Sequence, residues 1–112
     1  MTELQSLLRT LGITANLRGF RYLKRATELA IEDPDCLLNI GKLIYNTVAQ
    51  EFETTPKCVE RNIRTAIDSC WLHGNRKLLC QIAGYELQEK PTNSQFIDII
   101  SAYLISIQSP TV

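Results

Sequence analysis

Apolar residues recur every three or four positions along most of this chain, which is the spacing of an amphipathic helix. Each such segment would turn one apolar side toward a core. Proline, glycine and capping residues separate the segments, as they do between helices. We therefore predict an all-α fold of about six helices in one domain over residues 1–112. The helices are expected at about residues 2–11, 17–32, 36–52, 56–72, 76–83 and 93–107.

Local residue chemistry supports several of these boundaries. Residues 33–35, Asp-Pro-Asp, would end the second helix and cap the next, and Gly41 would interrupt the third. The many β-branched residues of 97–107 leave a strand as the alternative to the last helix. The candidate caps of helix N-termini are Thr2, Asn16, Thr55 and Thr92, the last in a capping box with Gln95.

The helix predicted over residues 56–72 has two unlike sides. Pro56 suits its first position, where a backbone N–H would be unpaired. An apolar helix ends at Phe52, only a few residues earlier. Helix, short turn and a second helix with Arg and Glu side chains is typical of a helix-turn-helix that reads the major groove. Val59, Ile63, Ala66, Ile67 and Cys70 form the apolar side, and Lys57, Glu60, Arg61 and Arg64 the other.

Composition limits the class of protein. The chain has 112 residues, of which 45% are hydrophobic, which fits one globular core and argues against disorder. Twelve basic and twelve acidic residues cancel, so the whole surface is not a nucleic-acid-binding surface. A local basic patch remains possible because the field that matters is local. Residues 17–25 contain four basic residues and no acid.

The cysteines and the single histidine predict neither a metal site nor a cofactor. Cys36 and Cys80 belong to no C-x-x-C pair, and His73 lies beside a glycine that suits a helix end. We interpret the cysteines as reduced thiols, with Cys70 in the core. Cys58 would be partly exposed, and its place at a helix N-terminus leaves a redox sensor as the alternative to a passive thiol.

No segment approaches the roughly 20 apolar residues of a membrane-spanning helix, and the N-terminus has no basic region followed by a long apolar run. We therefore expect a cytoplasmic protein without a membrane partner. We also expect no enzymatic activity, because no nucleophile–base pair, metal cluster or glycine-rich phosphate loop stands out.

A set of separated motifs carries a resemblance to a known family. They are Gly19-Phe20-Arg21-Tyr22-Leu23, Thr54-Thr55-Pro56, Val59-Glu60-Arg61-x-Ile63-Arg64-x-Ala66-Ile67, Trp71-x-x-Gly74-Asn75, Gly84-Tyr85 and Lys90-Pro91-Thr92-Asn93-Ser94-x-Phe96-Ile97. In this order and spacing they resemble the C-terminal DNA-binding domain of the stage-zero sporulation response regulator, over about residues 7–104. The resemblance implies a six-helix domain that recognises a short promoter element in double-stranded DNA.

Three departures from the family bear on function. Family members carry a phosphorylatable receiver domain before this one, whereas Met1 here stands almost at the first helix, so we expect no phospho-switch. Cys58 replaces an arginine that the family is expected to place on a base, which leaves the target sequence open. The last helix lacks the family's charged residues.

The resemblance implies DNA contacts along and beside the helix at residues 56–72. Glu60 can accept from a cytosine amino group, and Arg61 and Arg64 can reach guanine, so these three are the expected base contacts. The alternative is a solvated face with ion pairs such as Glu60–Arg64. Expected phosphate contacts are Thr55, Lys57, Asn75, Arg76 and Lys77, the last three at a helix start whose N–H groups suit an anion.

Other side chains have two interpretations. Arg18, Arg21 and Arg25 share one helix face, which is either solvated or a secondary surface for phosphate or a partner. Three aromatic side chains are expected in the core, namely Tyr22, Trp71 and Phe96.

The last helix bears on assembly. Phe96, Tyr103, Ile107 and either Ile99 or Ile100 would supply its core stripe, and Ile97, Leu104 and Ile105 would be left over. Surplus apolar surface marks a partner site, so this helix would pair two copies or bind another regulator.

The first hypothesis for function is a sequence-specific DNA-binding transcriptional regulator. The alternative is a protein-interaction module of the same fold that binds another regulator through this last helix.

Overall fold

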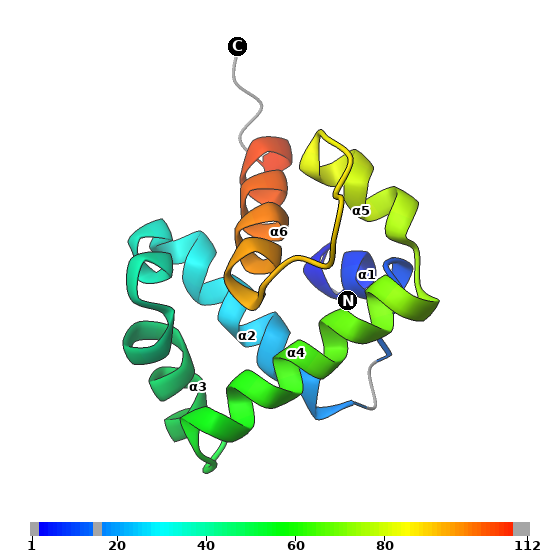
Figure 1. Ribbon diagram of the computed structural model, residues 1–112. Helices are drawn as coiled ribbons and strands as arrows, with labels where there is room; N and C mark the ends of the chain where they lie inside the picture. The colour runs from blue at the N-terminus through cyan, green and yellow to red at the C-terminus, as the bar shows by residue number, and fades with distance from the viewer. Residues whose placement is uncertain (1–2, 15–16, 109–112) are drawn as a thin grey trace.

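All regular secondary structure in the described part of the chain is helical. The computed structural model describes residues 3–14 and 17–108 and holds no strand in that part, so the all-α prediction is confirmed and the strand alternative for residues 97–107 is wrong. The elements, in chain order, are α1 (Glu3–Thr10), α2 (Arg18–Glu32), η1 (Pro34–Asn39), η2 (Gly41–Tyr45), α3 (Asn46–Glu51), α4 (Pro56–His73), α5 (Arg76–Ala83) and α6 (Asn93–Gln108) (Figure 1).

The third predicted helix is divided into three pieces. It begins as the 3₁₀ helix η1, continues as the π-helical turn η2 from Gly41, and becomes the α-helix α3 only at Asn46. Asp33 caps η1, since its carboxylate accepts a hydrogen bond from the backbone N–H of Asp35 at 3.1 Å. The predicted interruption near Gly41 is therefore confirmed.

The capping box predicted for the last helix is present. Thr92 and Gln95 form a reciprocal capping box at the start of α6, with distances of 2.9 and 3.1 Å. Gly84 ends α5 in the left-handed conformation, with φ +87°. Thr2 and Asn16 lie outside the described residues.

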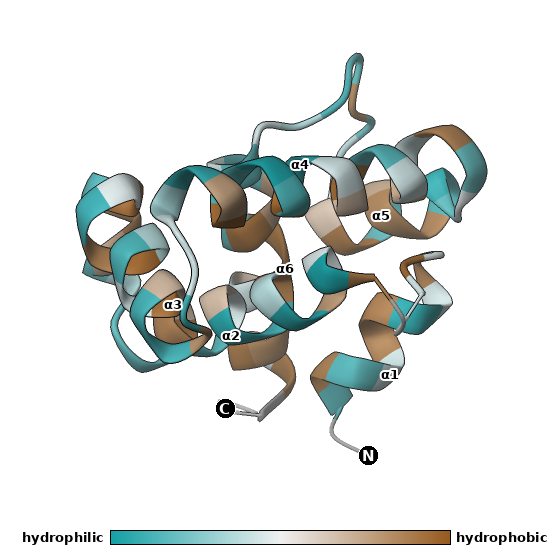
Figure 2. Cartoon of the chain, turned by 90° about the horizontal axis from the view of Figure 1, so that it is seen from below, coloured by the Kyte–Doolittle hydropathy of each residue, from teal (hydrophilic) through white to brown (hydrophobic). Residues whose placement is uncertain are grey.

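Helix α2 lies at the centre of the fold and packs against both α4 and α6 (Figure 1). Phe20, Leu23, Thr27 and Ala30 of α2 are buried. Gly19 allows α2 to approach α4 closely, because a Cβ at this position would lie 2.2 Å from the backbone oxygen of Asn62. The apolar side chains of the helices meet in one buried cluster, and the hydrophilic sides face outward (Figure 2).

The predicted face of α6 is wrong in part. Phe96 and Ile100 are buried as expected, but Ile97 and Leu104 are buried as well, whereas Ile107 is 46% exposed. The helix packs against α2, α4 and α5, so neighbours on several sides cover a wide stripe of it. The surplus apolar surface is therefore smaller than expected and lies near the C-terminal end of α6.

Trp71 is also placed differently from the prediction. Tyr22 and Phe96 belong to the core, but Trp71 is only partly buried and packs against the edge of the core. The guanidinium of Arg76 covers the indole, with its central carbon 3.9 Å from the ring centroid. Trp71 therefore joins the end of α4 to the start of α5.

Candidate nucleic-acid interface

Helices α3 and α4 are joined by a tight turn that fits a helix-turn-helix. The N–H of Phe52 and the N–H of Thr54 donate to carbonyls of α3, at 3.0 Å and 2.9 Å. Between them Glu53 has φ +53°, in the left-handed region that favours glycine. The residues around it contain no glycine or asparagine, so the sequence held no signal for this conformation.

The N-terminus of α4 is built as predicted. Thr55 has an extended backbone, and its hydroxyl oxygen accepts the N–H of Cys58 at 3.1 Å, while Pro56 occupies the first turn. The cap uses the acceptor capacity of the Thr55 hydroxyl and leaves its O–H free to donate. That donor is available to an anion at the start of α4.

The two sides of α4 are distributed as the sequence predicts. Val59, Ile63, Ala66, Ile67 and Cys70 are all buried. Lys57, Arg61 and Arg64 are exposed, and Glu60 is partly exposed. Burial raises the pKa of the Cys70 thiol to about 11, so this thiol stays protonated in the core. Cys58 is partly exposed, also as predicted.

Glu60 and Arg64 form an ion pair with an N–O distance of 2.9 Å, one helical turn apart. This pair is the one that the solvated-face alternative expects. With the Arg64 side chain 52% exposed, the pair contributes only about 0.3–0.5 kcal/mol to the helix. Lys57 and Arg61, in contrast, have no ion-pair partner among residues 3–14 and 17–108.

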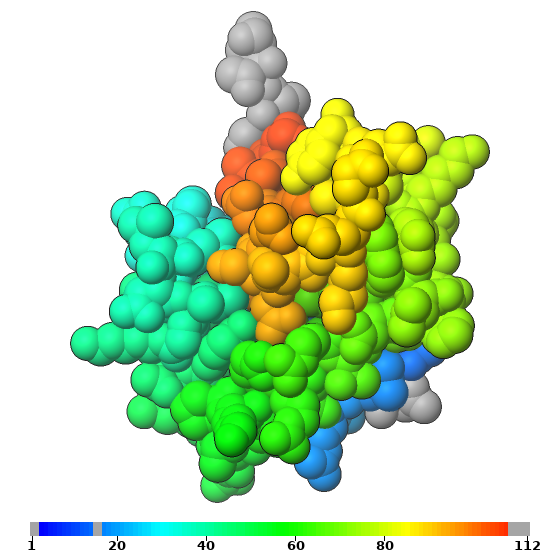
Figure 3. All heavy atoms as spheres, viewed as in Figure 1, coloured from blue at the N-terminus to red at the C-terminus, as the bar shows by residue number. Residues whose placement is uncertain are grey.

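The start of α6 and the segment before it hold α4 from one side. The Asn93 side-chain amide donates to the Tyr45 hydroxyl at 3.0 Å and to the backbone oxygen of Glu60 at 3.1 Å. Lys90 forms an ion pair with Asp68 of α4. In Figure 3 the start of α6 and the segment before it lie directly against α4 on the surface in view. These contacts fix the orientation of α4 beside Glu60.

Sequence reasoning did not assign a role to Asn93, Tyr45 or Lys90. Lys90 and Asn93 belong to one of the quoted motifs, but their partners lie 22 to 48 residues away in the chain. No local spacing rule connects residues at such separations. Burial raises the pKa of the Tyr45 hydroxyl, which therefore stays a neutral hydrogen-bonding group in this junction.

The predicted phosphate residues at the start of α5 differ in how free they are. Asn75 caps α5, and its side-chain oxygen accepts the N–H of Leu78 at 3.1 Å, which leaves the amide donors available. Arg76 donates through Nε and a terminal nitrogen to the Trp71 carbonyl, at 3.1 and 2.8 Å. Lys77 is exposed and forms no ion pair within the described part of the chain. Because a guanidinium has five N–H donors and Arg76 commits only two of them to Trp71, all three side chains keep uncommitted donors.

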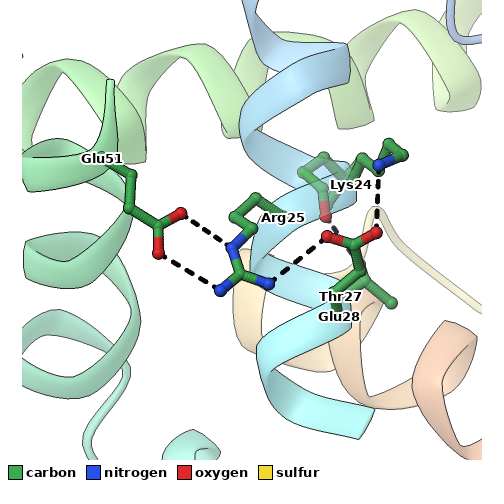
Figure 4. Close-up of polar contacts among 6 residues, drawn as sticks. Lys24, Arg25, Thr27, Glu28 and Glu51 are labelled. Carbon is green, nitrogen blue, oxygen red and sulfur yellow. Dashed lines mark hydrogen bonds and ion pairs between the residues drawn. The ribbon is translucent and has the colours of Figure 1, made fainter. Parts of the chain in front are cut away.

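Arg25 connects α2 to the end of α3. Its guanidinium makes two hydrogen bonds to the Glu51 carboxylate, at 2.7 and 3.2 Å, and a longer one to Glu28 at 3.5 Å (Figure 4). Lys24 pairs with Glu28 at 3.0 Å. Arg25 is thus committed within the fold, whereas Arg18 and Arg21 on the same helix have no carboxylate partner among residues 3–14 and 17–108.

Within the described residues, no group of three or more His, Cys, Asp or Glu side chains could hold a metal ion. In the same part of the chain, every helix is too short or too polar to cross a bilayer.

Comparison with known families decides the relationship of this chain. The sequence model of the family described as the sporulation initiation factor Spo0A C terminal matches residues 4–104. The chain belongs to this family. Members of this family are the DNA-binding effector domain of Spo0A, which regulates transcription. The family is not a known enzyme family. Membership therefore supports the prediction that this protein is a DNA-binding regulator. The motif-based resemblance is confirmed.

Proposed function

We propose that this protein is a sequence-specific transcriptional regulator that inserts α4 into the major groove of double-stranded DNA. The observation that carries this proposal is the exposed side of α4, with Lys57, Arg61 and Arg64 in a turn-linked helix pair of a Spo0A-type domain. The major groove, about 12 Å wide, admits an α-helix. Such a regulator acts on chromosomal DNA and therefore in the cytoplasm.

Arg61 is the strongest candidate for a base contact. Its side chain is exposed and no carboxylate in the described part of the chain neutralises it, so its donors are available to the O6 and N7 atoms of guanine. Glu60 and Arg64 are paired with each other, and DNA would have to compete with that pair. Because the pair is exposed and weak, Glu60 can exchange it for a cytosine amino group and Arg64 for guanine.

The flanks of α4 carry the proposed phosphate contacts. With 18 residues α4 is about 27 Å long, more than twice the groove width, so its ends reach beyond the bases. Thr55 and Lys57 lie at the N-terminal end. Asn75, Arg76 and Lys77 follow the C-terminal end, where the start of α5 presents backbone N–H groups.

The test begins with selection of bound sites from a random duplex pool. Affinity for the selected site is then measured by fluorescence anisotropy for wild type, Arg61→Ala and Arg64→Ala. Loss of a bidentate base contact costs about 1–3 kcal/mol, or roughly 5- to 150-fold in affinity. Lys24→Ala, which removes one positive charge from an intrahelical ion pair, serves as the matched control. Unchanged affinity in both arginine variants would refute the proposal.

The exposed end of α6 supports a second candidate role, in which two copies of the chain or another regulator meet there. Ile107 is 46% exposed and borders a surface hollow together with Leu7 and Tyr103. Sedimentation at tens of micromolar, with and without operator DNA, compares wild type with Ile107→Glu. A dimer lost in the variant supports pairing, and a strictly monomeric wild type rules self-association out. If DNA binding is also absent, co-sedimentation with a candidate regulator tests the interaction module.

A further inference from the structure

The basic residues of this chain divide into two groups. One group is engaged within the fold: Arg9 with the Phe20 ring, Lys24 and Arg25 with carboxylates of α2 and α3, Arg64 with Glu60, Lys90 with Asp68, and Arg76 with Trp71. The second group makes no ion pair or side-chain hydrogen bond within residues 3–14 and 17–108. It consists of Arg18, Arg21, Lys42, Lys57, Arg61 and Lys77.

Arg18, one of the two α2 residues in this second group, lies next to the proposed reading helix α4. Gly19 contacts the backbone of Asn62 so closely that a Cβ would lie 2.2 Å from its carbonyl oxygen. The residues that immediately precede this contact point in the two helices are Arg18 and Arg61, and both are exposed. The contact therefore brings the start of α2 beside the part of α4 that is proposed to enter the groove.

Arg21 lies one helical turn further along α2 and is also exposed. It lines a surface hollow with Phe52, the residue that follows α3. The ring of Tyr22, the next residue, contacts the Phe52 ring edge-on, with centroids 5.2 Å apart. Arg21 therefore borders the turn that leads into α4. Figure 2 shows hydrophilic residues on α2 and on the neighbouring outer side of α4.

We propose that Arg18 and Arg21 form a second phosphate-binding strip, which contacts the DNA backbone alongside the groove occupied by α4. This inference rests on the proposed function. Two arginines three residues apart on a helix share one face, and their unpaired guanidinium groups suit phosphate oxygens. A carboxylate-rich protein partner would satisfy the same charges, but continuity with Arg61 favours DNA. The fold decides which cations of α2 can bind phosphate. It pairs Lys24 and Arg25 with carboxylates, and it leaves Arg18 and Arg21 without such a partner among the described residues.

The experiment measures the salt dependence of DNA affinity for wild type, Arg18→Ala, Arg21→Ala, the double variant and Arg18→Lys. Each phosphate contact contributes about 0.9 to the slope of log affinity against log salt concentration. We expect each alanine variant to lower the slope by about 0.9, and the double variant by about 1.8. Arg18→Lys keeps the charge and should keep the slope. Lys24→Ala is the matched control, since it removes one charge from the same helix, and its slope should equal that of wild type.

A second readout separates phosphate contacts from base contacts. Arg18→Ala and Arg21→Ala should weaken binding to the selected site and to unrelated duplex equally, whereas Arg61→Ala should lower mainly the ratio of the two. Wild-type slopes in the α2 variants, with Arg61→Ala still impaired, would overturn the second strip and leave the proposed function intact. A folded wild type that binds no duplex would overturn both.

Discussion

Arg25 of α2 and Glu51, the last residue of α3, are joined by two hydrogen bonds between one guanidinium and one carboxylate (Figure 4). The pair links the central helix α2 to α3, the helix that the tight turn joins to α4. Arg25 is the principal cause of a lowered pKa of the Glu51 carboxyl group. The contact thus couples the position of α3 to the ionisation of one carboxylate.

The Arg25–Glu51 pair predicts a pH-dependent part of the stability. Because the pKa of Glu51 is lower in the fold than in the unfolded chain, its contribution is present above the ordinary pKa and is lost as pH falls through the folded-state value. Both side chains are partly exposed, so screening keeps the contribution below about 1 kcal/mol. Urea denaturation of wild type and Glu51→Gln should show a difference at pH 7 that shrinks in acid. A difference that persists at pH 3 would contradict the assignment.

Gly19→Ala should destabilise the protein by about 1–3 kcal/mol or more, through overpacking. The added Cβ would lie 2.2 Å from a backbone oxygen of Asn62 and 2.9 Å from the Cβ of Ala66, so α2 and α4 would have to separate. Gly41→Ala is the matched control, because nothing lies within 4 Å of a Cβ there. Thermal melting compares the two, and a Gly19→Ala protein as stable as wild type would disprove the close contact.

Ile63→Ala should lower the free energy of unfolding by about 2–5 kcal/mol, because the Ile63 side chain on α4 is fully buried in the core. Ile107→Ala provides a control of the same residue type at a position that is 46% exposed, and its effect should be small. Chemical denaturation measures both. Equal losses at the two sites would mean that the end of α6 is more deeply packed than described.

The thiols should differ in reactivity. Cys70 is fully buried with its pKa raised to about 11, whereas Cys36, Cys58 and Cys80 are partly exposed. Because the thiolate is the reactive form, iodoacetamide at pH 8 should modify Cys70 last. Mass spectrometry of timed samples checks the order, with a urea-unfolded sample as the control in which all four react. Early modification of Cys70 in the folded protein would contradict its burial.

The sequence by itself determined the local features of this protein. The starts of α4 and α6 follow from Thr55, Pro56 and the Thr92–Gln95 capping box, because the capping hydrogen bonds span only three residues. The buried and exposed sides of α4 follow from its sequence, because apolar residues recur every three or four positions and charged residues lie between them. The family could be recognised because its motifs are contiguous residues in a fixed order.

Tertiary structure decided the features that depend on distant neighbours. Apolar residues are spread around several sides of α6, so its periodicity could not select a single face. Packing against three other helices buried Ile97 and Leu104 and left Ile107 exposed. Which arginines stay free was equally undetermined, since Arg25 is neutralised by Glu51, 26 residues away, while Arg18 and Arg21 are not. The physical reason is the same in both cases. Helix propensity and capping act between neighbours in sequence, whereas burial and ion pairing depend on which surfaces the folded chain brings together.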